Sequence, residues 1–153
     1  MSFEAKVKEM GLTVPEVAKP VAAYVPSIRV GDYVYTSGQI PFVEGKLAYA
    51  GKIGKDLSLE QGYEAAKVCA LNCLAAAKSV IGSLDNIEQI VKVVGFVNSA
   101  PGFVDQPKVI NGASELIGTI FGKQGEHTRS AVGVPELPIN AAVEVEMIFK
   151  VKS

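Results

Sequence analysis

Histidine, cysteine and tryptophan are scarce in this chain of 153 residues, which has one histidine, two cysteines and no tryptophan. Cys69 and Cys73 lie four residues apart within a helical pattern. Two thiols and one histidine do not supply the four ligands of a structural zinc site, so we expect no metal. Both cysteines are interpreted as small buried apolar residues.

Basic charge is not in excess either. The chain has 15 Lys and Arg residues against 16 Asp and Glu residues, a net charge of -1 and a sequence pI near 5.9. Proteins that bind nucleic acid gather basic residues on one face, whereas here they are scattered along the sequence. We therefore expect no nucleic acid partner.

Long apolar runs and targeting signals are also missing. The richest apolar run, over residues 68–81, is broken by Asn72 and Lys78, and residues 1–16 contain no apolar core of the kind found in secretory signals. These features predict a cytoplasmic protein without a membrane segment.

Familiar catalytic motifs are not found. The sequence has no nucleophile elbow, no zinc-protease pair and no calcium loop, and the run GTIFGKQ from Gly118 has the wrong spacing for a phosphate loop. The single histidine, His127, is interpreted as a solvated residue in the loop before a strand.

The pattern of apolar residues predicts one α+β domain over residues 1–153, with an N-terminal arm over residues 1–20 that contains a short helix. Two strands with a tight turn at residues 30–32 are expected over 28–40. A capping box at Ser58 begins a long helix that ends at Gly82, and a second helix ends at Phe121. Both helices are expected on one side of a mixed or antiparallel sheet.

The strand expected over residues 87–97 is apolar on both of its faces. Such a strand must be covered on both sides, and the helices of this chain can cover only one. The sequence therefore predicts a partner subunit over the open face of the sheet.

The segment from His127 to Lys150 carries the most informative charges. Its two halves are predicted to be strands joined by a Pro-bracketed turn, and the second half alternates between apolar and polar residues, with Glu144 on the polar face. The same parity places Val132 toward the core and Arg129 on the face of Glu144. The pair is either a surface ion pair or the two ends of a site for a small anion.

Four other polar or glycine positions are candidates for a site. Tyr24 lies in a connector with Pro15, Pro20 and Pro26, and it can equally be packing over an edge. Ser37 and Gly38 end a strand, where a glycine marks a bulge or a close approach to the backbone. Asn111 lies on the second long helix.

Three sequence blocks, found in order after about Pro20, are similar to the signature of a known family. They are TSGQIP at 36–41, RSAVGV at 129–134 and LPINAAVEVE at 137–146. Together they resemble the YjgF/RidA family of reactive intermediate (imine/enamine) deaminases, also described as L-PSP-like endoribonucleases. The longer N-terminal arm and the NGASELIGTIFG helix resemble a divergent branch of that family.

The resemblance implies a chorismate-mutase-like fold and a homotrimeric barrel with ligand clefts between subunits. It implies hydrolytic deamination of small enamine or imine acids such as 2-aminoacrylate, with no cofactor. By position, Arg129 matches the carboxylate-binding arginine and Glu144 the acidic residue that activates water. Tyr24, the Ser37-Gly38 backbone and Asn111 match residues that line the cleft.

One position departs from the family pattern. Many deaminating members have a cysteine two residues after the arginine, where this chain has Ala131. A trimer that binds small carboxylates without turning them over is therefore an alternative function. An endoribonuclease is a third possibility, which the acidic pI and the single histidine do not favour.

Overall fold

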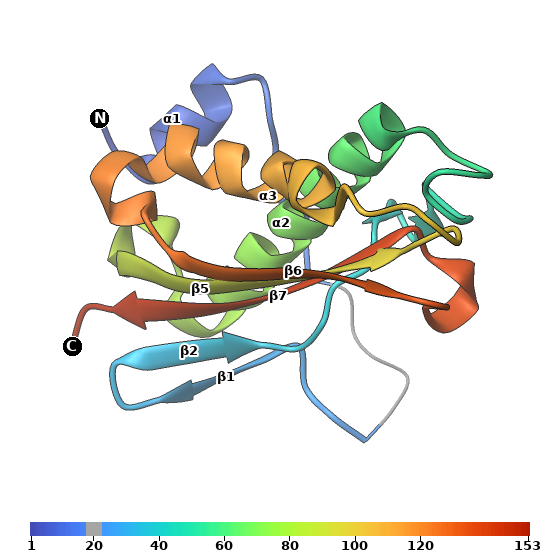
Figure 1. Ribbon diagram of the computed structural model, residues 1–153. Coiled ribbons are helices and arrows are strands. Elements are labelled where there is room, and N and C mark those ends of the chain that lie inside the picture. The colour runs from blue at the N-terminus through green and yellow to red at the C-terminus, as the bar shows by residue number, and fades with distance from the viewer. Residues whose placement is uncertain (18–22) are drawn as a thin grey trace.

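A five-stranded mixed sheet forms the centre of the protein, and its helices lie on one face (Figure 1). The computed structural model describes residues 1–17 and 23–153. The helices are α1 (Phe3–Glu9), α2 (Leu59–Ile81) and α3 (Gln106–Phe121), with short 3-10 turns at Leu84–Asn86, Gly122–Gly125 and Pro138–Asn140. The strands are β1 (Ser27–Val30), β2 (Tyr33–Thr36), β3 (Phe42–Val43), β4 (Lys46–Leu47), β5 (Ile87–Asn98), β6 (Thr128–Val134) and β7 (Val143–Val151).

The strand order in the main sheet is β1-β2-β7-β5-β6, and β3 and β4 form a separate two-stranded sheet. All neighbours in the main sheet are antiparallel except β5 and β6, which are parallel. The last two strands therefore do not pair with each other, because β5 lies between them. The prediction of a mixed sheet with two long helices on one side is confirmed.

Helix α2 begins and ends where its sequence predicts. The Ser58 hydroxyl accepts from the Gln61 backbone, the Gln61 side chain accepts from the Ser58 backbone, and Gly82 ends the helix with a positive φ of 84°. Alanines and cysteines line its inner face, so the helix lies close to the sheet. Cys69 and Cys73 are fully buried, as predicted. Burial raises the pKa of the Cys69 thiol well above its ordinary value and the pKa of Cys73 to about 12.

The two long helices also pack closely against each other. A Cβ atom at Gly112 of α3 would lie 2.9 Å from the carbonyl carbon of Tyr63 in α2, and closer to the carbonyl oxygen. The absence of a side chain at Gly112 therefore permits the close approach of the helices.

The orientation predicted for β6 is wrong. Because Arg129, Ala131 and Gly133 pair with Val93, Gly95 and Val97, they face the helices. Val132 faces the opposite side and is 45% exposed. Small side chains are needed beneath α3, since a Cβ at Gly133 would lie 2.6 Å from the Gln106 side chain.

The sheet face opposite the helices is open. It carries exposed apolar or aromatic side chains from three strands, namely Ile28, Val30, Tyr33, Tyr35 and Val132. The polar residues of β7, including Glu144 and Glu146, also point to this face, as their alternation predicts. The two-sided apolar character expected of β5 is present, because Val94 and Phe96 are only half-buried on the open side.

The N-terminal segment starts with the expected short helix. The Asp85 carboxylate accepts from the backbone of Phe3 at 2.6 Å, and the Glu4 carboxylate pairs with Lys78 at 3.1 Å. Residue 20, the expected end of the arm, lies outside the described residues. Among the helices of residues 1–17 and 23–153, none is long and apolar enough to cross a membrane.

Candidate functional site

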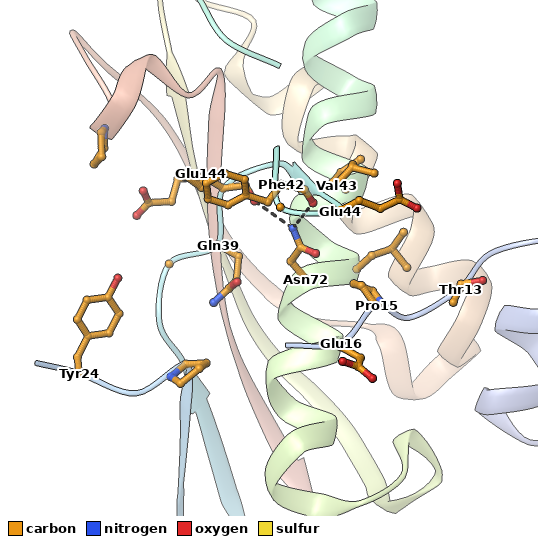
Figure 2. Close-up of a pocket in the computed structure, with 17 residues that line it drawn as sticks. Thr13, Pro15, Glu16, Tyr24, Gln39, Phe42, Val43, Glu44, Asn72 and Glu144 are labelled. Atoms are coloured by element: carbon orange, nitrogen blue, oxygen red, sulfur yellow. Dashed lines mark hydrogen bonds between the residues drawn. The ribbon is translucent and has the colours of Figure 1, made fainter. Parts of the chain in front are cut away.

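Three of the predicted site residues line one open cavity of about 1160 Å³. Tyr24 precedes β1, Gly38 follows β2, and Glu144 points outward from β7. Figure 2 shows Tyr24 and Glu144 on one side of the loop that carries Gln39, with Asn72 on the other. We call Tyr24, Ser37, Gly38 and Glu144 the carboxylate half-site.

Gly38 lies directly against the Glu144 carboxyl group. A Cβ atom at Gly38 would lie 2.8 Å from Glu144 Cδ and closer still to Oε2. Ser37 itself does not line the cavity; its hydroxyl donates to the Val25 carbonyl at 2.6 Å, and its backbone N–H donates to Pro26 O at 2.8 Å. Ser37 therefore fastens the segment next to Tyr24 to the end of β2.

The environment of Glu144 changes the acidity of its carboxyl group. Burial raises the pKa of the Glu144 carboxyl group, and the nearby Glu146 carboxylate adds to the rise. A carboxylate whose pKa is raised in this way can accept a proton from water more readily than an exposed one.

Arg129 lies elsewhere, at the β6 edge of the sheet, beneath α3. Its Nη1 donates to Asn111 Oδ1 at 2.8 Å and to Ser114 Oγ at 3.2 Å. Within residues 1–17 and 23–153, no carboxylate forms a salt bridge with Arg129, and its Nε and Nη2 have no hydrogen-bond partner. We call Asn111 and Arg129 the arginine half-site.

The two half-sites are separated within one chain. Glu144 is in register with Phe96 and Val132, on the open face. Arg129 is three residues before Val132 and two strands from β7, so it lies roughly 10 Å along and roughly 10 Å across the sheet from Glu144. It also points to the opposite face. The prediction that Arg129 and Glu144 share a face is therefore wrong, and they form no ion pair.

His127 lies in the loop before β6, as predicted, but it is not a fully solvated residue. It is half-buried; its Nε2 lies 2.9 Å from Ser114 Oγ, and its Nδ1 lies 2.6 Å from the Gly125 carbonyl oxygen. Ser114 was not predicted from the sequence. Its spacing of three residues from Asn111 places both on one face of α3 and could have revealed it.

The rest of the cavity wall was not anticipated either. Asn72, which interrupts the apolar run of α2, donates from Nδ2 to the carbonyls of Ile40 at 3.0 Å and Phe42 at 3.1 Å. It thereby holds the loop that follows Gly38. Thr13, Pro15 and Glu16 of the N-terminal segment also line the cavity.

A metal centre is not evident in the described part of the chain. No group of three or more His, Cys, Asp or Glu side chains there is arranged to hold a metal ion.

The family model, the related sequences and the related structures all indicate the same family. Residues 4–151 match the family described as "YjgF/chorismate mutase-like, putative endoribonuclease". The crystal structure of Atu1372, a protein of unknown function from Agrobacterium tumefaciens, is 43% identical, with a TM-score of 0.92 and coverage of 98% of this chain and 92% of that one. Protein TCP17 of Trypanosoma cruzi is 37% identical over 97% of this chain and 94% of its own length.

A more distant relative has a named activity. The 2-iminobutanoate/2-iminopropanoate deaminase of Dermatophagoides farinae is 29% identical over 92% of this chain and 95% of its own length. The yeast relative MMF1, 33% identical over 138 residues, is named as mitochondrial, so the cytoplasmic location stays a prediction. The matched family model, the high identity to TCP17 and the shared fold together show that the chain belongs to the YjgF/RidA family.

Proposed function

We propose that this protein hydrolyses small imine or enamine acids to 2-keto acids and ammonia, in clefts between the subunits of a homotrimer. The proposal rests on the separation of the arginine half-site from the carboxylate half-site within one chain. The Arg129 guanidinium, which forms no salt bridge among the described residues, lies beneath α3 at one edge of the sheet, and the Glu144 carboxyl group, with a raised pKa, lies on the open face. The halves of one chain do not meet, so a complete site requires two chains.

The open sheet face supports a trimer. The exposed side chains of Ile28 and Val132 lie on the two edge strands of this face, and Tyr35 lies on a strand between them. Water contacts these side chains in a single chain. Burying such a surface against neighbouring copies stabilises the assembly by about 25 cal/mol per Å² of apolar area. A closed arrangement of three copies brings the arginine half-site of one chain to the carboxylate half-site of the next.

Arg129 binds the substrate carboxylate. Its planar guanidinium can donate two parallel hydrogen bonds to a carboxylate, and its Nε and Nη2 are available for them. Asn111 fixes the guanidinium through Nη1. Next to Arg129, Ala131 occupies the position where many family members have a cysteine, so this end of the cleft has no thiol.

Glu144 activates the attacking water. As the water oxygen bonds to C2 of the imine, Glu144 accepts a proton from it, the electron pair of the C=N bond moves to nitrogen, and the nitrogen takes up a proton from solvent. In the carbinolamine, the nitrogen takes up the proton held by Glu144, the hydroxyl proton passes to solvent, and the C–N bond breaks as the carbonyl forms, which releases ammonia. One water is consumed and no electrons leave the substrate, so the reaction needs no redox partner.

Two other functions remain as alternatives. The replacement of the family cysteine by Ala131 favours a non-catalytic trimer that binds small carboxylates. An endoribonuclease has less support. The described residues that line the cavity include Glu16, Glu44 and Glu144 but no Lys or Arg, and such a surface repels RNA phosphates.

The test uses 2-aminoacrylate generated in situ from serine by a dehydratase. The purified wild-type protein should speed the release of pyruvate and ammonia, and Arg129→Ala should lower kcat/KM roughly 100-fold or more, because charge-assisted hydrogen bonds are lost. Arg29→Ala is the matched control, since Arg29 lies on β1 and, within the described residues, its side chain donates only to the backbone carbonyls of Gly31 and Lys152. Pyruvate binding without any acceleration would instead support the non-catalytic trimer.

A further inference from the structure

A chain of polar contacts continues beyond Arg129, along α3 to the turn that follows it. Ser114 Oγ lies 3.2 Å from Arg129 Nη1 and 2.9 Å from His127 Nε2, and His127 Nδ1 lies 2.6 Å from Gly125 O. None of these three additional residues was needed for the proposed reaction. Together they connect the guanidinium to the backbone that follows α3.

With His127 in its neutral form, the chemistry of the partners sets the direction of each hydrogen bond. The Gly125 carbonyl can only accept, so His127 Nδ1 carries the proton. In neutral imidazole, Nε2 is then an acceptor, and the Ser114 hydroxyl donates to it. The lone pairs of Ser114 Oγ are left to accept from Arg129, which has only donors.

The far end of this chain is rigidly placed. A Cβ atom at Gly125 would lie 2.7 Å from the Ile117 carbonyl oxygen, so the 3-10 turn Gly122–Gly125 is in close contact with α3. Arg129 lies on β6, which pairs with β5, and His127 lies two residues before it, next to the start of that strand. Asn111 and Ser114 are about one turn apart on α3. The Arg129 guanidinium is thus held directly by two residues of α3, and indirectly by the turn through His127 and Ser114.

We propose that Ser114 and His127 are positioning residues for Arg129, which acts in carboxylate binding as proposed above. They fix Nη1 so that the guanidinium keeps one orientation and its Nε and Nη2 stay available to the ligand. His127 acts through Ser114, and neither residue touches the substrate. A guanidinium fixed in advance loses less conformational entropy when it binds a carboxylate.

The experiment measures both the order of the Arg129 side chain and the binding of pyruvate. ¹⁵N relaxation of the Arg129 Nε–Hε group in the intact wild-type protein reports its mobility. Calorimetry gives the Kd for pyruvate, and the coupled assay gives kcat and KM. The variants are Ser114→Ala, His127→Leu and His127→Gln, the last of which keeps an acceptor that can reach Ser114. The control is Thr119→Ala, because Thr119 is an exposed hydroxyl on the same helix that bonds only to Glu115 O.

Ser114→Ala should make the Arg129 side chain more mobile and raise Kd and KM about 5- to 10-fold, as expected for the net loss of one hydrogen bond while Asn111 still accepts from Nη1. The kcat should change by less than about twofold, because this interaction is equal in the ground and transition states. His127→Leu should have a smaller effect in the same direction. His127→Gln should restore most of it, and Thr119→Ala should match the wild type.

Unchanged Arg129 mobility in Ser114→Ala and His127→Leu would overturn the positioning role, and so would increased mobility without any change in Kd. If the wild type binds no pyruvate, the proposed carboxylate binding by Arg129 is wrong. The comparison of Arg129 mobility then still decides whether Ser114 and His127 position its side chain. Should Ser114→Ala not fold, the two His127 variants carry the same comparison.

Discussion

The contact between Gly38 and Glu144 allows the proposed catalysis to be perturbed with little effect on the fold. The φ of Gly38 lies outside the left-handed region, so alanine can adopt its backbone conformation without strain. The new Cβ would lie 2.8 Å from Glu144 Cδ, and an ordinary contact begins at 3.4 Å. The carboxyl carbon must therefore retreat by about 0.6 Å and its oxygen further, which is enough to misplace the attacking water.

The Gly38→Ala variant should therefore lose activity and keep its stability. A misplacement near 1 Å lowers the rate by about 100-fold, whereas rotation of a flexible carboxylate costs about 1 kcal/mol in unfolding free energy. The assay is the rate of pyruvate release from 2-aminoacrylate, together with a denaturant titration. Gly118→Ala is the matched control, because a Cβ atom at Gly118 of α3 would meet no other atom within 4 Å. Wild-type kcat/KM in Gly38→Ala would refute the role of Glu144 in activating water.

Three further predictions concern the carboxylate pair, the thiols and the helix contact. Glu146→Gln should lower the pKa of Glu144, since it removes a neighbouring negative charge; the acidic limb of the kcat/KM profile should shift to lower pH, and an unshifted limb would exclude the coupling. Cys69 and Cys73 should not react with a thiol reagent in the native protein and should react only on unfolding, because burial raises both thiol pKa values. Gly112→Ala should lower the unfolding free energy by about 1–3 kcal/mol in a urea titration, because the added methyl group meets the backbone of α2; an unchanged midpoint would contradict the close helix packing.

The elements with strong local signals could be predicted from the sequence. The capping box at Ser58 and the glycine at residue 82 define α2, and the alternation in β7 places Glu144 on the polar face. These features depend on neighbouring residues in the chain. The periodicity and capping rules therefore apply to them directly.

The orientation of β6 could not be predicted in this way. Its sequence has apolar residues at both parities, and the larger side chain, Val132, was assigned to the core. Packing instead places Ala131 and Gly133 beneath α3, because the helix approaches too closely for larger side chains. Val132 therefore lies on the open face, where its side chain is exposed in a single chain. A rule that places apolar side chains in the core of one chain does not predict this position.

The separation of the two half-sites within one chain could not be predicted from local sequence patterns either. The family resemblance names residues from both half-sites, but the distance between Arg129 and Glu144 depends on the insertion of β5 between β6 and β7. The network of Ser114 and His127 depends on contacts between α3, a 3-10 turn and β6, which lie apart in the sequence. Such long-range contacts are set by topology, so the local pattern did not reveal them.

In the proposed function, each active site combines Arg129 of one subunit with Glu144 of another. Subunit complementation tests this arrangement. Arg129→Ala and Glu144→Gln proteins are each expected to be inactive, and they are unfolded together, refolded and assayed as mixed trimers. If the cleft lies between subunits, random mixing in equal amounts leaves about one quarter of the clefts with both residues, and about that share of wild-type activity should return. If both residues act within one chain, the mixture stays inactive, and the account is contradicted.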